Sequence, residues 1–402
     1  MGTFWRSISG VLALLLVVPA AASGGRERRV PPGKPIVIGL HAPMTGAVPL
    51  PSQSLGPASD IYWKWLRHKG MTINGRNVEI VLRNDNGNPQ QARQVCREMV
   101  KEDGAFILAG VLQNSSGSVQ SEECAEVAEN AGISYISLGG TTAGVKDLTN
   151  HFAISMTFRA QGRLLADHFV EKMKARGRNN GVVSFNTPHN LEATRAFRNR
   201  LEDRKADLDV ERLIARTAGA TEAQAVAAEL KAAGVENVFV FTSPTFFIQL
   251  LQAANNLSYE PLWSGIGISV TTSDDFVSLV CRNGVSFRGR FFSPLPAFGD
   301  RADYDPTFEL AMAAIYPTGP KDGVVWQGWS TAKQIAELLR ATGPRLTTRS
   351  FISGVEAASD LSTGILPALD FTPRDHFGAS QTHVLAPRCS DERWHTGAKP
   401  YG

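Results

Sequence analysis

Three Gly-, Ser- or Thr-containing turns follow β-type runs in the first half of the chain, at 36–46, 106–118 and 133–144. An open parallel sheet binds its ligand just beyond the carboxyl ends of its strands. The last two turns bring hydroxyls and backbone N–H groups to that edge, at or near helix starts, where a carboxylate or another anion can be held. Ser115, Ser116 and Thr141 therefore predict an anion-binding edge.

A simpler explanation exists for each of these side chains. Ser115, Ser116 and Thr141 each suit a helix N-cap, a common role worth about 1 kcal/mol. Their occurrence after neighbouring strands favours the ligand site. Thr45, after the first strand, is equally placed to shape its loop or to touch ligand.

The second half of the chain offers further candidates at the ends of its own strands. Thr242 and Ser243 follow the buried β-type run 238–242. Ser243 is equally well explained as the cap of a helix that has Pro244 at its first position. His189 is either a loop histidine or a ligand contact.

Motifs and charge exclude several function classes. We find no GxSxG, HExxH or GxxxxGK[ST] sequence, and no clean GxGxxG after a strand. The net charge of +3 and a single short basic cluster at 26–29 give little support for nucleic-acid binding. The histidines are scattered and no CxxC pair occurs, so a zinc site is the weaker interpretation of the cysteines. We expect a ligand-capturing protein with no catalytic residues, cofactor or metal.

The N-terminus has the pattern of an export signal. Arg6 gives a positive start, 11–18 is a short apolar run, and Ala20–Ala22 suits cleavage before Ser23. We predict a signal peptide over 1–22, with an uncleaved anchor as the alternative. Residues 23–34 are expected to be a disordered leader, and no later segment reaches roughly 18 apolar residues. The mature protein is predicted in the periplasm or at the cell surface.

Four cysteines follow this signal, and an even count in an oxidising compartment predicts two disulfides. Cys96 and Cys124 each lie about two turns into consecutive predicted helices. Consecutive helices of a right-handed βαβαβ unit run side by side, so both thiols would sit at a similar height. We therefore pair Cys96 with Cys124, which leaves Cys281 with Cys389.

Strands and helices alternate along most of the chain, which predicts two α/β lobes. The predicted strands are 36–40, 77–83, 105–109, 134–137, 181–185, 210–214, 238–242, 261–264 and 382–385. The predicted helices are 54–69, 89–102, 116–130, 160–176, 191–203, 222–233, 244–255, 304–316, 324–341 and 350–357. Trp326 and Trp329 are interpreted mainly as core residues of the first lobe.

The order and spacing of several motifs resemble a known family over about residues 35–388. These motifs are IVIGLHAPMTG, ING at 73–75, RNDNGNPQQA at 83–92, ILAGVLQNSSGSV and YISLGGTTAG. Together they are similar to the type I periplasmic binding proteins, in the branch of leucine/isoleucine/valine-binding proteins that serve ABC importers. The resemblance implies a monomer that captures a small solute and delivers it to ABC permease subunits.

The resemblance also implies an α/β fold of two Rossmann-like lobes with parallel sheets, joined by a three-crossover hinge. The crossings would fall near 153–159, 289–296 and 366–373. Lobe 1 would comprise 35–155 and 290–365, and lobe 2 would comprise 156–289 and 366–402.

The positions that hold the ligand carboxylate in this family fall on two turns of this chain. Gly140 is added because it lies between Gly139 and Thr141 in the second turn. The resulting residues are Asn114, Ser115, Ser116, Gly139, Gly140 and Thr141. In amino-acid-binding members, an acid from the second lobe holds the ligand ammonium. The matching position here is Ile266, and His189-Asn190 replaces the family's tyrosine-glycine turn. Asp274 or Asp275 could substitute if this alignment is shifted.

These departures set the expected ligand. A buried ammonium without a carboxylate partner costs several kcal/mol. We expect an exported solute-binding protein for a branched-chain amino acid or related organic acid, with a carboxylate that lacks an α-amino group favoured. Two alternatives stay open, namely a ligand-sensing module for a receptor partner and, less favoured, an exported enzyme, which would show turnover.

Overall fold

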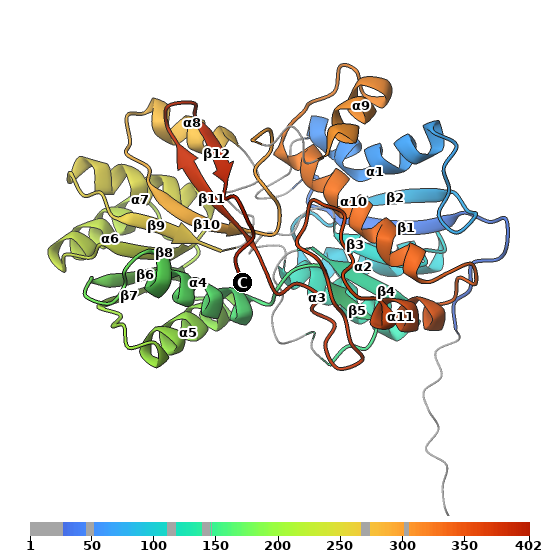
Figure 1. Ribbon diagram of the computed structural model, residues 1–402, viewed down its shortest axis with the longest axis horizontal. Coiled ribbons are helices and arrows are strands. Elements are labelled where there is room, and N and C mark those ends of the chain that lie inside the picture. The colour runs from blue at the N-terminus through green and yellow to red at the C-terminus, as the bar shows by residue number, and fades with distance from the viewer. Residues whose placement is uncertain are drawn as a thin grey trace, which may run out of the picture.

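The computed structural model describes residues 27–45, 52–110, 118–138, 145, 147–266, 274–300 and 305–402. Two α/β lobes lie side by side, each built around its own sheet (Figure 1). The first sheet has the order β2-β1-β3-β4-β5, and all of its strand pairs are parallel. Its strands are β1 Ile36–Ala42, β2 Val78–Asn84, β3 Ile107–Gly110, β4 Ser134–Ser137 and β5 His151–Ala153.

Helices from both ends of the chain surround this first sheet. They are α1 Ser52–His68, α2 Pro89–Lys101, α3 Ser118–Ala131, α9 Pro306–Ile315, α10 Gly323–Ala341 and α11 Thr348–Ala357. Alternate β1 residues face opposite sides because strand side chains alternate. Ile38 belongs to a core with α1 and α10, whereas Val37 packs against the core formed by α2 and α3. Trp326 and Trp329 are buried in the first of these cores, as their core interpretation predicts.

The second sheet has the order β12-β11-β10-β9-β8-β6-β7. Its strands are β6 Asn180–Phe185, β7 Val210–Ile214, β8 Asn237–Phe241, β9 Leu262–Gly265, β10 Gly289–Ser293, β11 His383–Arg388 and β12 Arg393–Thr396. Five strands, β6 to β10, pair in parallel, and β11 and β12 add an antiparallel edge. Its helices are α4 Phe158–Lys172, α5 Pro188–Asp203, α6 Ala220–Ala232, α7 Pro244–Asn256 and α8 Asp274–Arg282.

The chain passes between the lobes after β5, after β10 and before β11, as the three-crossover hinge predicts (Figure 1). Residues 290–293 pair within the second sheet, although we expected them in lobe 1. Leu369 and Phe371 pack in the first core, although we expected them in lobe 2. We therefore propose lobe boundaries after Ser293 and after Gly378, whose backbone N–H still donates to the carbonyl of Ala153, the last residue of β5.

Part of the segment predicted to be a disordered leader is packed on lobe 1. The Val30 N–H donates to the Leu346 carbonyl at 3.0 Å, and the Thr348 N–H donates to the Arg28 carbonyl at 3.0 Å. Val30 is buried in the core that α1 and α10 share. For 28–30 the prediction of disorder was therefore wrong, because Val30 offers an apolar side chain within an otherwise polar stretch.

Both predicted disulfides are formed. Cys96 and Cys124 join α2 to α3 with a Cα–Cα distance of 5.6 Å. Cys281, in the last turn of α8, is joined to Cys389, which follows β11, with a Cα–Cα distance of 5.3 Å. Among the described residues, we find no helix long and apolar enough to cross a membrane.

The close contact between α1 and α10 gives a stability prediction. A Cβ atom added at Gly328 would lie 2.0 Å from the carbonyl oxygen of Ala58. Gly328→Ala should therefore force the helices apart and lower the free energy of unfolding by about 1–3 kcal/mol in urea denaturation. The matched control is Gly56→Ala on α1, where nothing lies within 4 Å of the added atom. That variant should be neutral or stabilised by up to about 1 kcal/mol. Equal stability of the two variants would contradict this packing.

Candidate functional site

The lobe 1 residues predicted to hold a ligand carboxylate lie outside the described residues. They are Asn114, Ser115, Ser116, Gly139, Gly140 and Thr141. Their role stays a prediction. The predicted residues that the structure does describe belong to lobe 2, namely His189, Thr242, Ser243 and Ile266.

The described part of the lobe 1 edge is a polar turn built by the ends of β1 and β2. The Thr45 hydroxyl donates to Asn86 Oδ1 at 2.8 Å and accepts from Asn84 Nδ2 at 2.7 Å. Asn86 and Gly87 have φ angles of 54° and 63°, a conformation that Asn and Gly adopt most readily. Of the two roles considered for Thr45, loop shaping is the one seen in these contacts.

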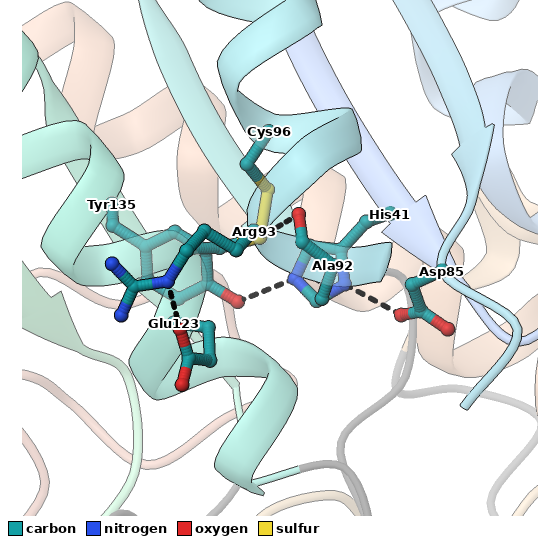
Figure 2. The surroundings of a disulfide bond; sticks show 8 residues. His41, Asp85, Ala92, Arg93, Cys96, Glu123 and Tyr135 are labelled. Atoms are coloured by element: carbon teal, nitrogen blue, oxygen red, sulfur yellow. Dashed lines mark hydrogen bonds and ion pairs between the residues drawn. A yellow bond between two sulfur atoms is a disulfide. The ribbon is translucent and has the colours of Figure 1, made fainter. Parts of the chain in front are cut away.

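Asp85, between Asn84 and Asn86 of this turn, begins a buried polar chain that runs through β1 to β4 (Figure 2). His41 Nδ1 on β1 lies 2.7 Å from Asp85 Oδ2, just after β2. His41 Nε2 lies 2.8 Å from the Tyr135 hydroxyl on β4. The Gly87 N–H donates to Asp85 Oδ1 at 2.8 Å, so this chain also fixes the turn. Buried hydrogen-bonded polar groups of this kind rigidify their surroundings.

In lobe 2, the loop that follows β6 is joined to the end of β8. The Thr187 hydroxyl donates to Asn190 Oδ1 at 2.6 Å. Asn190 Nδ2 in turn donates to the Phe241 carbonyl at 2.5 Å. These bonds hold the first turn of α5, and with it His189, against the carboxyl end of the second sheet.

Two phenylalanine rings surround His189. The His189 ring centroid lies 5.6 Å from that of Phe158 and 6.3 Å from that of Phe241. The Phe158 and Phe241 centroids are 5.4 Å apart. Ile266, just beyond β9, is buried in the same apolar cluster as both phenylalanines. The structure thus brings His189 against Phe158 and Phe241, and it buries Ile266 in the same cluster as these two rings. We call these four residues the lobe 2 corner: Phe158, His189, Phe241 and Ile266.

The two predicted hydroxyl residues beside this corner have local partners. Ser243 caps α7, since its hydroxyl accepts from the Phe246 N–H at 3.2 Å. The Thr242 hydroxyl donates to the Ser243 carbonyl at 3.3 Å and is buried. The capping explanation of Ser243 is therefore the one seen in the structure, and ligand contact stays a prediction for both.

Acidic side chains near this end of lobe 2 also have partners. Asp274, considered as a substitute for the acid missing at Ile266, accepts from the Trp394 N–H at 2.9 Å and so ties α8 to β12. Burial raises the pKa of its carboxyl group. Glu192, one turn after His189, lies 3.5 Å from Arg159 Nε. An incoming ammonium would have to compete with this guanidinium for the Glu192 carboxylate.

Sequence reasoning missed the two phenylalanines of the lobe 2 corner. Phe241 ends a buried β run, where a core role is the default interpretation. Phe158 follows the first crossing and is far from Phe241 in sequence. Only the folded chain shows that both rings meet the imidazole of His189. Ligand sites are lined mostly by apolar and aromatic side chains with a few polar groups, and this buried corner has that composition.

Comparisons with known proteins agree with this architecture. The family model described as periplasmic binding protein matches residues 35–386. An amino acid binding protein from Pseudomonas aeruginosa is 30% identical over 149 residues, which make up 35% of this chain and 37% of that protein. The match thus spans little more than a third of the relative's length.

Solved structures share the fold at low sequence identity. The solute binding protein of an ABC transporter from Rhodopseudomonas palustris, in complex with 3,4-dihydroxy benzoic acid, is 16% identical with a TM-score of 0.69, over 90% of this chain and 96% of that one. A branched-chain amino acid transporter substrate binding protein from Streptococcus pneumoniae, in complex with isoleucine, is 13% identical with a TM-score of 0.71, over 90% and 99%.

Proposed function

Because the chain belongs to the periplasmic binding protein family, we propose that it is the exported solute-binding protein of an ABC importer. Its solute is a small carboxylate with an apolar body and no α-amino group. The two relatives of known structure bind an aromatic acid and an amino acid, so the fold accommodates both kinds of ligand. The side chains of this chain must therefore decide between them.

The lobe 2 corner is the observation that supports an amino-free ligand. Ile266 occupies the position where the resemblance implies an acid, and it is buried in the same apolar cluster as Phe158 and Phe241. An ammonium placed against these apolar groups would lose its hydration without gaining a charged partner, at a cost of several kcal/mol. An aromatic or branched apolar body would instead bury its surface there, at about 25 cal/mol per Å².

The lobe 1 edge supports the carboxylate half of the proposal. The turns that hold Ser115 and Thr141 carry hydroxyls suited to an anion, and the first of them leads into the N-terminus of α3. A solute that contacts both lobes favours the hinge conformation in which both contacts are made. Capture then needs only a higher affinity of the solute for this conformation than for the other. The loaded monomer would then dock on the permease subunits in the periplasm or at the cell surface.

A thermal unfolding panel tests this proposal. The oxidised mature protein is heated with leucine, isoleucine, valine, other amino acids, benzoate and short branched acids. At 100-fold above the dissociation constant, a true ligand adds about 2.7 kcal/mol and raises Tm visibly. We expect the rise with one or more amino-free acids. A rise in Tm with amino acids alone would contradict the proposed solute class. So would the absence of a rise with every carboxylate in the panel.

A further inference from the structure

A histidine lies against the disulfide of lobe 1 (Figure 2). The ligand atoms of His41, Cys96 and Cys124 all lie within 4.8 Å of one another, and all three residues are buried. Among the residues that the structure describes, this is the only group of three His, Cys, Asp or Glu residues that meets this distance. Two thiolates and an imidazole are the donor set of many tetrahedral zinc sites.

The contacts of His41 prepare its ring for metal binding. Asp85 Oδ2, 2.7 Å from Nδ1, favours the tautomer with the proton on Nδ1 and a lone pair on Nε2. Metal-ligating histidines typically donate their other N–H to such a carboxylate, which fixes the ring and raises its basicity. The Tyr135 hydroxyl now lies 2.8 Å from Nε2, so it has to turn aside when a cation takes this lone pair.

We propose that the reduced form of this disulfide, together with His41, is a binding site for a soft divalent cation such as Zn²⁺ or Cd²⁺. A phosphine reductant and water convert the disulfide to two thiols and the phosphine oxide. The cation then replaces the two thiol protons, which are released to solvent. A water completes the four-coordinate shell.

The surroundings keep the two sulfurs near each other after the bond is broken. Arg93 on α2 forms ion pairs with Glu123 and Glu126 on α3, the second at 2.6 Å. Gln120 Nε2 on α3 donates to the Gly87 carbonyl just before α2, also at 2.6 Å. In a tetrahedral zinc site, two sulfurs at about 2.3 Å from the metal lie roughly 3.5–4 Å apart. A small separation of α2 and α3 would supply that distance.

The test uses Cd²⁺ and the double variant Cys281→Ser with Cys389→Ser, which leaves only the thiols in question. After phosphine reduction, we expect one Cd²⁺ per chain and a sulfur-to-metal charge-transfer band in the ultraviolet. His41→Ala should weaken binding at least tenfold, and Asp85→Asn, which keeps a hydrogen-bonding group, should weaken it about 10–100-fold. The unreduced protein should show no band.

The matched control carries Cys96→Ser and Cys124→Ser instead, and keeps the other cysteine pair, for which the described part of the chain provides no such histidine. The proposal is overturned if this reduced control binds Cd²⁺ as tightly, or if His41→Ala and Asp85→Asn leave the affinity unchanged. Circular dichroism accompanies each titration. An unfolded reduced protein that does not refold with Cd²⁺ would also overturn it. The result does not depend on the identity of the transported solute.

Discussion

Replacing Cys281 and Cys389 together by serine will lower the free energy of unfolding by about 5 kcal/mol. The bond spans 108 residues of sequence, and the loss of loop-closure entropy in the unfolded chain grows with that separation. The closed loop contains α9, α10 and α11, which belong to the other lobe. The bond therefore restricts the unfolded chain across two crossings of the hinge. Urea denaturation of oxidised wild type and variant measures the difference.

Reduction provides the control for this prediction. With a phosphine reductant present, wild type and variant have both lost the Cys281–Cys389 bond, and their unfolding curves should coincide to within about 0.5 kcal/mol. If the two proteins still differ in their free energy of unfolding after reduction, the difference comes from the serine side chains and not from the lost bond. A loss below about 1 kcal/mol in the oxidised proteins would show that this bond adds little to stability.

Acidification will also destabilise the protein strongly, through a buried histidine. His151 on β5 is stacked on Tyr135, and its Nε2 lies 2.7 Å from the Ser137 hydroxyl oxygen. Burial, with a smaller contribution from the nearby His376, lowers the pKa of His151 to about 3. The pKa in the unfolded chain is about 6.5. The folded state therefore resists protonation, and its stability is fully present above pH 6.5.

This contribution is lost as the pH falls from 6.5 toward 3, because the unfolded chain then binds the proton first. Between pH 7 and pH 4.5 the loss from His151 alone should be about 2–3 kcal/mol. Burial and the nearby Arg290 and Lys172 lower the pKa of His168 to about 4, which adds a loss in the same direction.

A neutral replacement isolates the histidine. His151→Gln keeps a hydrogen-bonding group beside Ser137 but cannot take up a proton in this range. It should be less stable than wild type at pH 7 and lose about 2–3 kcal/mol less on going to pH 4.5. Equal acid sensitivity of variant and wild type, measured by urea denaturation at both pH values, would exclude this role for His151.

The alternating elements were predictable from sequence because their periodicity is local. Strand Ser134–Ser137 and strand Val210–Ile214 have the predicted bounds. Helix α8 and strand β12 were not predicted. Strand β12 is short and polar at Arg393, and it exists through pairing with β11 and through the Asp274 bond to Trp394. Such elements depend on long-range contacts, which a sequence window does not contain.

The candidate site was less accessible from sequence than the fold. Cysteine pairing could be inferred because the register of consecutive helices places Cys96 and Cys124 together. In contrast, His41 and Tyr135 are separated by 94 positions and meet only after β1 and β4 join one sheet. The same holds for Phe158 and Phe241. From its residue type alone, each of these two phenylalanines would be interpreted as an ordinary core residue.

The proposed ligand is a carboxylate without an α-amino group, and isothermal calorimetry with two matched pairs of acids distinguishes it from an amino acid. Leucine and 4-methylpentanoate differ only by that amino group, as do phenylalanine and 3-phenylpropanoate. We expect at least one amino-free acid to bind with one molecule per chain, and at least tenfold more tightly than its amino acid. Tighter binding of leucine or phenylalanine would contradict it, and would indicate that an acid such as Glu192 holds the ammonium.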